Sequence, residues 1–243
     1  MKILWCLHGN LQQPIVWEVL SYALEQPGKD FFIQSVSLWE TLSCNCWDWA
    51  NGFCARVRLA SQVSSPQHYL LGYSLGGRLA WHALLAAPEL WSGAMIVSAD
   101  PGSNHGQLRQ KSLERDRIWA NRFLTEPWDT LLAEWDALPI FCQRPCPTPR
   151  PESAFDRQKL AHAFEAYSKG HMEELTERLS SLSVPITYIT GSEDRHYSQL
   201  GKTLQSQVAA LTHIEVKDAG HRVPWEQPDA FLIILKEVLE LGG

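Results

Sequence analysis

The stretch HYLLGYSLGGRLAWHALLAAP, residues 68–88, decides how the rest of the chain is interpreted. It begins as a short apolar run typical of a strand and continues with the apolar spacing of a helix. Between the two, GYSLG matches the G-x-S-x-G pattern of a nucleophile elbow, a tight turn from strand to helix. Such a turn requires Gly72 and Gly76 beside Ser74, and it raises the serine hydroxyl above the carboxyl edge of a sheet. The pattern therefore predicts that Ser74 is a reactive serine, against the alternative of a glycine-rich turn used only for packing.

Strand-like runs and helical patterns alternate on both sides of this turn. The chain has 243 residues, of which 45% are hydrophobic and 20% charged, enough for one large domain with a full core. The alternation predicts an α/β fold with a mostly parallel sheet covered on both faces. The expected strands are 2–7, 31–37, 68–73, 93–98, 185–190 and 212–217, and the expected helices are 14–25, 48–63, 75–87, 197–209 and 226–241.

Residues 100–183 interrupt the alternation. This interval contains helical patterns and a proline-rich turn, RPCPTPRPE at 144–152, but nothing that resembles a strand. Structureless loops of this length are rare in compact domains, so the interval predicts an inserted helical cap, and caps of this kind usually cover an active site. The expected division is therefore a core of residues 1–99 and 184–243 with a cap, or lid, of residues 100–183.

Composition argues against several other classes of function. The net charge is −6, from which no nucleic-acid or membrane-surface role follows. No apolar run reaches the roughly 18 residues that span a bilayer, and the first residues lack the layout of a signal peptide, so a cytoplasmic protein is expected. The six cysteines lack the spacing of a zinc site, and we expect them to be thiols and no metal to be bound.

A serine nucleophile needs an acid and a histidine later in the chain, in that order. The segment VPITYITGSEDRHY, 184–197, is a strand pattern that runs into Glu193 and Asp194, and VKDAGHRVPWEQP, 216–228, is one that runs into His221. We expect Asp194 and His221 to complete the triad. Glu193 and Asp218 remain alternatives for the acid, and His196 and His213 remain alternatives for the histidine.

The segment CLHGN at 6–10 predicts the other half of the site, a turn that supplies donors for an oxyanion. One backbone N–H is expected from Asn10 and a second from Leu75, directly after the serine. His8 is expected either to contribute to the site or only to hold the turn together.

Three segments resemble one family: GYSLGGR at 72–78, ERDRIWANRFLTEPWDTLLAEWDALPIF at 114–141 in the expected cap, and AGHRVPWEQP at 219–228. The first and third are common in the α/β-hydrolase superfamily apart from Arg78, and the cap segment is the specific one. These segments resemble the 2-succinyl-6-hydroxy-2,4-cyclohexadiene-1-carboxylate (SHCHC) synthases of menaquinone and phylloquinone biosynthesis. Together with the pattern of strands, the resemblance covers nearly the whole chain. The resemblance implies an α/β-hydrolase fold with a mostly parallel central sheet, flanking helices and an inserted helical cap.

The resemblance also implies a lyase. Members of this family remove a proton from 2-succinyl-5-enolpyruvyl-6-hydroxy-3-cyclohexene-1-carboxylate and eliminate pyruvate, without a cofactor. It implies that Ser74, Asp194 and His221 form the triad, that Arg78 and Trp135 line the substrate site, and that Tyr73 lies beside the serine. Because the small-molecule substrate is a polycarboxylate, a guanidinium one helical turn past the serine is suited to bind a carboxylate by paired, charge-assisted hydrogen bonds.

The cap adds a cluster of basic residues, Arg109, Lys111, Arg115, Arg117 and Arg122, opposed there only by Glu114 and Asp116. Arg109 and Arg115 are the first candidates to reach the substrate. The alternative is a solvated face held by ion pairs, which is common for charges at helical spacing.

Some segments depart from the family pattern. Where paired arginines three apart are usual, Arg109 aligns with the first and Ser112 with the second, so Lys111 or Arg115 would have to substitute. Where a further arginine is usual, EAYSKGH at 165–171 offers Tyr167 or Lys169. These departures keep open a serine hydrolase that acts on a small anionic ester or thioester. A non-catalytic binding protein of the same fold is disfavoured because no triad member is missing.

Overall fold

The computed structural model describes residues 1–25, 30–40, 43–61, 66–142, 144, 146 and 148–241. Within these residues six strands form one parallel sheet in the order β2-β1-β3-β4-β5-β6. The strands are β1 (Lys2–Leu7), β2 (Phe31–Val36), β3 (Gln67–Tyr73), β4 (Trp91–Val97), β5 (Ile186–Gly191) and β6 (Leu211–Val216). All six predicted strands are confirmed, with ends that differ by at most two residues.

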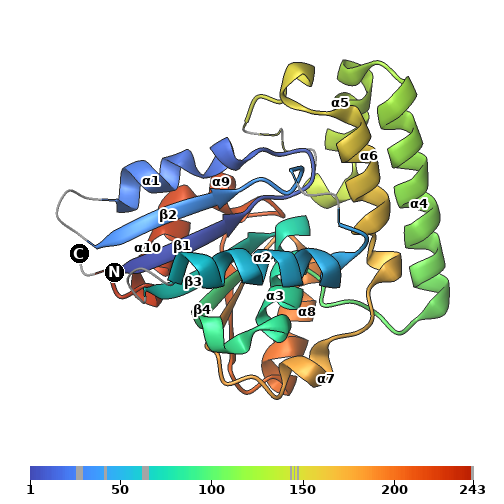
Figure 1. Cartoon of the computed structure of the whole chain (residues 1–243). Helices are drawn as coiled ribbons and strands as arrows, with labels where there is room; N and C mark the ends of the chain where they lie inside the picture. Colours follow the sequence, from blue (N-terminus) through green and yellow to red (C-terminus); the bar gives the residue numbers. More distant parts are fainter. Residues whose placement is uncertain are drawn as a thin grey trace.

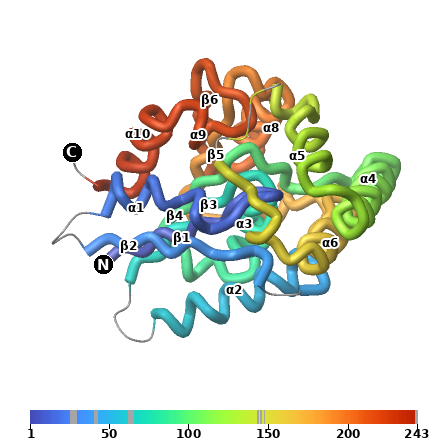
Figure 2. The backbone as a smooth tube through the Cα atoms, turned by 90° about the horizontal axis from the view of Figure 1, so that it is seen from above, coloured from blue at the N-terminus to red at the C-terminus, as the bar shows by residue number. Residues whose placement is uncertain are grey.

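Helices cover both faces of the sheet (Figures 1 and 2). One face carries α1 (Glu18–Leu24) and α10 (Pro228–Val238), and the other carries α2 (Cys46–Ser61), α3 (Leu75–Ala86) and α8 (Arg195–Gln207). The two-residue period of a strand explains this arrangement. In β1, Leu4 and Cys6 pack against the first group of helices, whereas Trp5 and Leu7 pack against the second.

One predicted helix is divided and one short helix was not predicted. The segment predicted at 14–25 is a 3-10 turn (Pro14–Trp17) followed by α1, whereas the helix predicted at 226–241 corresponds to α10, which the short α9 (Val223–Glu226) precedes. Pro228 begins α10, as expected for a residue that has no backbone N–H and suits the first turn of a helix. The predicted end of the helix at 48–63 includes residues 62 and 63, which lie outside the described residues.

Between β4 and β5 the described residues form helices and turns but no strand, as predicted. These helices are α4 (Gly106–Thr125), α5 (Trp128–Asp136), α6 (Arg157–Ala166) and α7 (Thr176–Leu179). Figure 1 shows α4, α5 and α6 together beyond the carboxyl ends of the strands, whereas α7 lies beside the core near α8. The helices α4 to α6 are the part of the chain to which the term cap applies below. Among the described residues, no helix combines the length and apolar character that crossing a bilayer requires.

The strand order places a site between β1 and β3. From β1 the chain proceeds to β2 on one side of the sheet and later returns to β3 on the other. In open parallel sheets, ligands bind outside the carboxyl ends of the strands at such a switch point. Leu7 at the end of β1 is aligned with Gly72 in β3, so the segment after β1 and the turn at Ser74 lie side by side.

Candidate active site

The turn at Ser74 is strained and tightly enclosed. Ser74 has a φ of 52°, which is uncommon for a residue other than glycine, and its N–H donates to the Val97 carbonyl at 2.9 Å. A Cβ on Gly72 would lie 2.6 Å from the Gly76 carbonyl oxygen, and one on Gly76 would lie 2.4 Å from the Leu7 carbonyl oxygen. Both predicted glycines are therefore required by contact with backbone.

The three residues predicted as the triad lie in hydrogen-bond contact. His221 Nε2 is 3.1 Å from Ser74 Oγ, and His221 Nδ1 is 2.7 Å from Asp194 Oδ2. His221 is 2% exposed and Asp194 is 6% exposed, so solvent competes little for these hydrogen bonds. Each residue follows the carboxyl end of a strand, Ser74 after β3, Asp194 after β5 and His221 after β6. The parallel sheet thereby brings together residues that are far apart in the sequence.

The alternative residues are placed elsewhere. Glu193 forms an ion pair with Arg144 at 2.5 Å, and the side chain of Asp218 is 70% exposed. His213 lies 2.7 Å from the Thr190 hydroxyl, where burial lowers its pKa. His196 lines the cavity but is exposed.

The segment after β1 adjoins the turn at Ser74, because Gly76 N–H donates to the His8 carbonyl at 3.0 Å. His8 is fully buried: its Nε2 accepts from Leu38 N–H at 3.1 Å, which leaves Nδ1 to donate to the Gly9 carbonyl at 2.9 Å. Burial lowers the pKa of His8 to about 4, so it is neutral at pH 7. These contacts support the structural interpretation of His8. The backbone N–H groups of Asn10 and Leu75 have no hydrogen-bond acceptor among the described residues.

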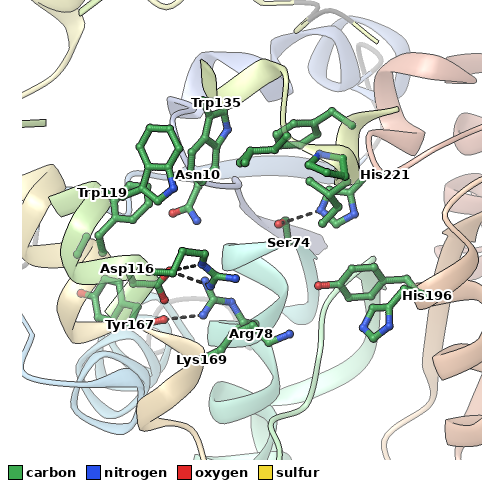
Figure 3. A pocket seen from close by; sticks show the side chains of 18 residues that line it. Asn10, Ser74, Arg78, Asp116, Trp119, Trp135, Tyr167, Lys169, His196 and His221 are labelled. Carbon is green, nitrogen blue, oxygen red and sulfur yellow. Dashed lines mark hydrogen bonds and ion pairs between the residues drawn. The ribbon is translucent and has the colours of Figure 1, made fainter. Parts of the chain in front are cut away.

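A cavity of about 340 Å³ separates Ser74 from the cap (Figure 3). Its aromatic wall comes mainly from the cap and includes Trp119, Trp135, Phe141 and Phe164, and its polar lining includes Arg78, Arg115, Asp116, Tyr167 and Lys169. In Figure 3, Arg78, Asp116 and Lys169 lie together below Ser74, Trp135 lies above it, and His221 lies to its right.

Arg78 differs from the other cations of the cavity. It is 9% exposed, and its Nη1 donates to the Tyr167 carbonyl at 2.6 Å. No carboxylate among the described residues lies within ion-pair distance of its guanidinium. In contrast, Arg115 is paired with Asp116 at 2.8 Å, and Lys169 is paired with Asp100 at 2.5 Å. A buried cation without a protein anion is costly, and an anionic ligand would remove that cost.

The structure brings some of the other predicted substrate residues to the cavity. Arg115 and Trp135 line it, and so do Tyr167 and Lys169, the candidates for the missing family arginine. Tyr73 lines an adjoining recess, with its ring 5.5 Å from that of His221, and burial raises the pKa of its phenol.

Arg109 does not reach the cavity. Its Nε donates to the Gly170 carbonyl at 3.0 Å, which holds the side chain outside the cavity lining. Lys111 and Arg117 are exposed on α4, and Arg122 forms ion pairs with Glu126 and Glu134 on the cap surface. The alternative of a solvated, ion-paired face thus describes much of the basic cluster.

Tyr197 lines the cavity but was not predicted from the sequence. Its buried ring lies 5.1 Å from that of His221, and burial raises the pKa of its phenol, so the hydroxyl is a hydrogen-bond donor at neutral pH. No hydrogen bond holds this hydroxyl among the described residues. The available signal was its position one helical turn after Asp194, on the face of α8 that meets the core.

Comparison with known proteins defines the class. A family model described as the alpha/beta hydrolase family matches residues 34–232. The solved structure of MenH from S. aureus has a TM-score of 0.82 and 20% sequence identity, over 99% of this chain and 94% of that one. The chain therefore belongs to the alpha/beta hydrolase family, and the predicted fold class is confirmed.

Two curated relatives narrow this assignment. The 2-succinyl-6-hydroxy-2,4-cyclohexadiene-1-carboxylate synthase of Yersinia pseudotuberculosis serotype O:1b is 32% identical over 192 residues, which are 75% of this chain and 68% of the relative. The synthase of the same name from Serratia proteamaculans is 29% identical over 263 aligned positions, which cover 99% of this chain and 94% of the relative. Within the alpha/beta hydrolases, the chain belongs to the SHCHC synthase family, whose members are enzymes.

Proposed function

We propose that this enzyme eliminates pyruvate from 2-succinyl-5-enolpyruvyl-6-hydroxy-3-cyclohexene-1-carboxylate to give SHCHC, as a lyase of menaquinone or phylloquinone biosynthesis. The observation that carries the proposal is the position of Arg78. A buried guanidinium without a carboxylate partner lines the same cavity as the Ser74–His221 pair. A site for neutral esters would gain nothing from that charge, whereas a polycarboxylate neutralises it.

In the proposed reaction, the bond that breaks first joins ring carbon C2 to its hydrogen, next to the succinyl ketone. The electrons form the C2–C3 double bond, the C3–C4 double bond shifts to C4–C5, and the C5–O bond to the enolpyruvyl group breaks. The released enolpyruvate takes up a proton and becomes pyruvate. The atoms therefore balance without an oxidant or a reductant.

The triad supplies the base for this step. As His221 Nε2 accepts the Ser74 proton across the 3.1 Å contact, Ser74 Oγ takes the C2 proton, so the serine ends neutral and the one transferred proton resides on His221. Asp194, 2.7 Å from Nδ1, fixes the tautomer that leaves Nε2 free to accept and stabilises the imidazolium that forms.

Three groups of donors complete the proposed site. The backbone N–H groups of Asn10 and Leu75 would stabilise the enolate oxygen that develops on the ketone. Arg78 would bind one carboxylate by two parallel hydrogen bonds, and the Tyr197 hydroxyl would donate a further one. Arg115 and Trp135 would bound the substrate on the cap side.

The deciding experiment supplies purified protein with the enzymatically generated substrate and measures pyruvate release by coupled NADH oxidation. We expect Ser74→Ala and Arg78→Gln to abolish or strongly reduce turnover. Arg117→Gln, which changes an exposed arginine on α4, should retain it. Turnover no faster than the spontaneous rate, together with cleavage of activated esters that survives Arg78→Gln, would instead establish a serine hydrolase.

A further inference from the structure

A cluster of buried charges adjoins the site and takes no part in the proposed chemistry. The Asp136 carboxylate lies between two arginines: Oδ1 accepts from Arg222 Nη2 at 2.6 Å, and Oδ2 accepts from Arg150 Nη2. The side chains of Arg222 and Arg150 are 4% and 7% exposed, respectively, and that of Asp136 is 25% exposed. These three residues are called the Asp136 clasp below.

The clasp joins two segments that carry site residues. Asp136 is the last residue of α5 and directly follows Trp135, which lines the cavity. Arg222 directly follows His221. The ion pair between Asp136 and Arg222 therefore connects the cap to the turn that carries the histidine.

The surroundings of Arg222 leave it little freedom. Its Nη1 donates to the Arg144 carbonyl at 2.8 Å, and its guanidinium lies over the Phe141 ring at 3.8 Å. The same ring is 5.9 Å from that of His221. Movement of the Arg222 side chain would thus disturb both the turn and the aromatic ring beside the histidine.

A second carboxylate holds the same turn from the other side. Glu226 accepts from the N–H groups of Gly220, at 2.6 Å, and Arg222, at 3.0 Å. It is also paired with Arg144. The residues on either side of His221 are therefore fixed by Glu226 from the core and by Asp136 from the cap.

We propose that Asp136 is a positioning residue for His221, which acts through Arg222 and couples the placement of α5 to the Ser74–His221 hydrogen bond. The inference rests on the triad in the proposed function. Reaction rates depend steeply on such alignment, and a displacement of about 1 Å costs about 100-fold. Without the Asp136 carboxylate, two buried guanidinium groups would face each other unneutralised and would move apart.

The test compares Asp136→Asn, which keeps the shape and removes the charge, with Glu134→Gln on the same helix. Glu134 pairs with Arg122 on the cap surface and touches no triad residue. Two rates are measured per folded molecule: covalent modification of Ser74 by a fluorophosphonate, and kcat for pyruvate release. We expect both rates to fall about 10- to 100-fold in Asp136→Asn with KM changed less than about threefold, and Glu134→Gln to match the wild type.

A further variant separates positioning from folding. Arg222→Gln keeps the Asp136–Arg150 pair, so it provides the same test if Asp136→Asn does not fold. It should lose Ser74 reactivity to a similar extent, and the double variant should be no worse than either single one, because both act through one contact. Wild-type reactivity of Ser74 in folded Asp136→Asn or Arg222→Gln would overturn the inference, whatever the melting temperature. Because the fluorophosphonate reports on Ser74 and His221 alone, a failure of the lyase proposal would appear separately, as wild-type modification without pyruvate release.

Discussion

Replacement of Arg78 by methionine should weaken catalysis without weakening the fold. If Arg78 binds a substrate carboxylate through two charge-assisted hydrogen bonds, each worth about 1.5 to 2 kcal/mol, their loss amounts to about 3 to 4 kcal/mol. At 1.36 kcal/mol for each factor of ten, kcat/KM should fall about 10²- to 10³-fold.

The substitution should cost much less stability than most replacements of a buried residue do. Arg78 is 9% exposed and has no carboxylate partner among the described residues, so the folded protein bears the desolvation cost of its charge. The variant loses the hydrogen bond to the Tyr167 carbonyl at 2.6 Å, worth about 1 to 2 kcal/mol, and a weak one to Met172 Sδ at 4.0 Å. Relief of the buried charge should offset this loss, and the free energy of unfolding should stay within about 1 kcal/mol of the wild type or rise.

The assay pairs pyruvate release over a range of substrate concentrations with urea unfolding of the free protein. Arg78→Lys keeps the charge but loses the planar fork, so we expect an intermediate loss of about tenfold in kcat/KM. Arg117→Gln, at an exposed position on α4, is the surface control. Two results would refute the reasoning: a kcat/KM in Arg78→Met within about threefold of the wild type, or a loss of about 3 kcal/mol in stability, which would make Arg78 a structural residue.

Three further predictions follow from individual contacts. Gly76→Ala should destabilise the fold by about 3 kcal/mol or more in urea unfolding, because the added Cβ would lie 2.4 Å from a backbone carbonyl oxygen. The control is Gly52→Ala on helix α2, where the added Cβ has no atom within 4 Å, and this variant should be as stable as the wild type or more stable. Tyr197→Phe should lower kcat/KM about 3- to 10-fold through one lost hydrogen bond, and an unchanged value would exclude contact with the substrate. Burial lowers the pKa of His82 to about 4, below its unfolded value of about 6.5, so between these two pH values the unfolded state binds the extra proton and stability decreases as the pH is lowered. In His82→Gln the slope of unfolding free energy between pH 6 and 4.5 should be flatter by about 1.2 kcal/mol per pH unit, and an unaltered slope would contradict the assignment.

Much of the fold was predictable because it rests on local patterns. Each strand is a short apolar run bounded by turn residues, and parallel pairing follows from the helices between strands. The sequence did not predict α9, a single turn at Val223–Glu226 that is too short for a helical period to show and lies almost wholly before the helix predicted at 226–241. Among the described residues the helix ends were predicted about as closely as the strand ends, except for the end of α10, which lies at Val238 and not at residue 241.

The placement of the three residues of the proposed triad was predictable for a related reason. Ser74, Asp194 and His221 each follow a strand, and parallel strands present their carboxyl ends at one edge of the sheet. Sequence order alone therefore placed them together. The Arg109 side chain, by contrast, lies on a helix whose rotation about its axis depends on packing against residues that are distant in the chain. The contact that holds Arg109 away from the cavity is with Gly170, 61 residues later.

The same dependence on distant contacts decides which cation of the cavity is available to an anion. Arg115, Lys169 and Arg78 all line it, and the sequence alone does not rank them. Arg115 is neutralised by the adjacent Asp116, and Lys169 is neutralised by Asp100, 69 residues earlier. Arg78 contacts a carbonyl 89 residues away, which orients the guanidinium but leaves its charge unbalanced. A count of basic residues would therefore overstate the number of carboxylate sites. The pairing argues that Arg78 dominates anion recognition, and that Arg115 and Lys169 contribute only where a substrate carboxylate competes with Asp116 or Asp100 for them.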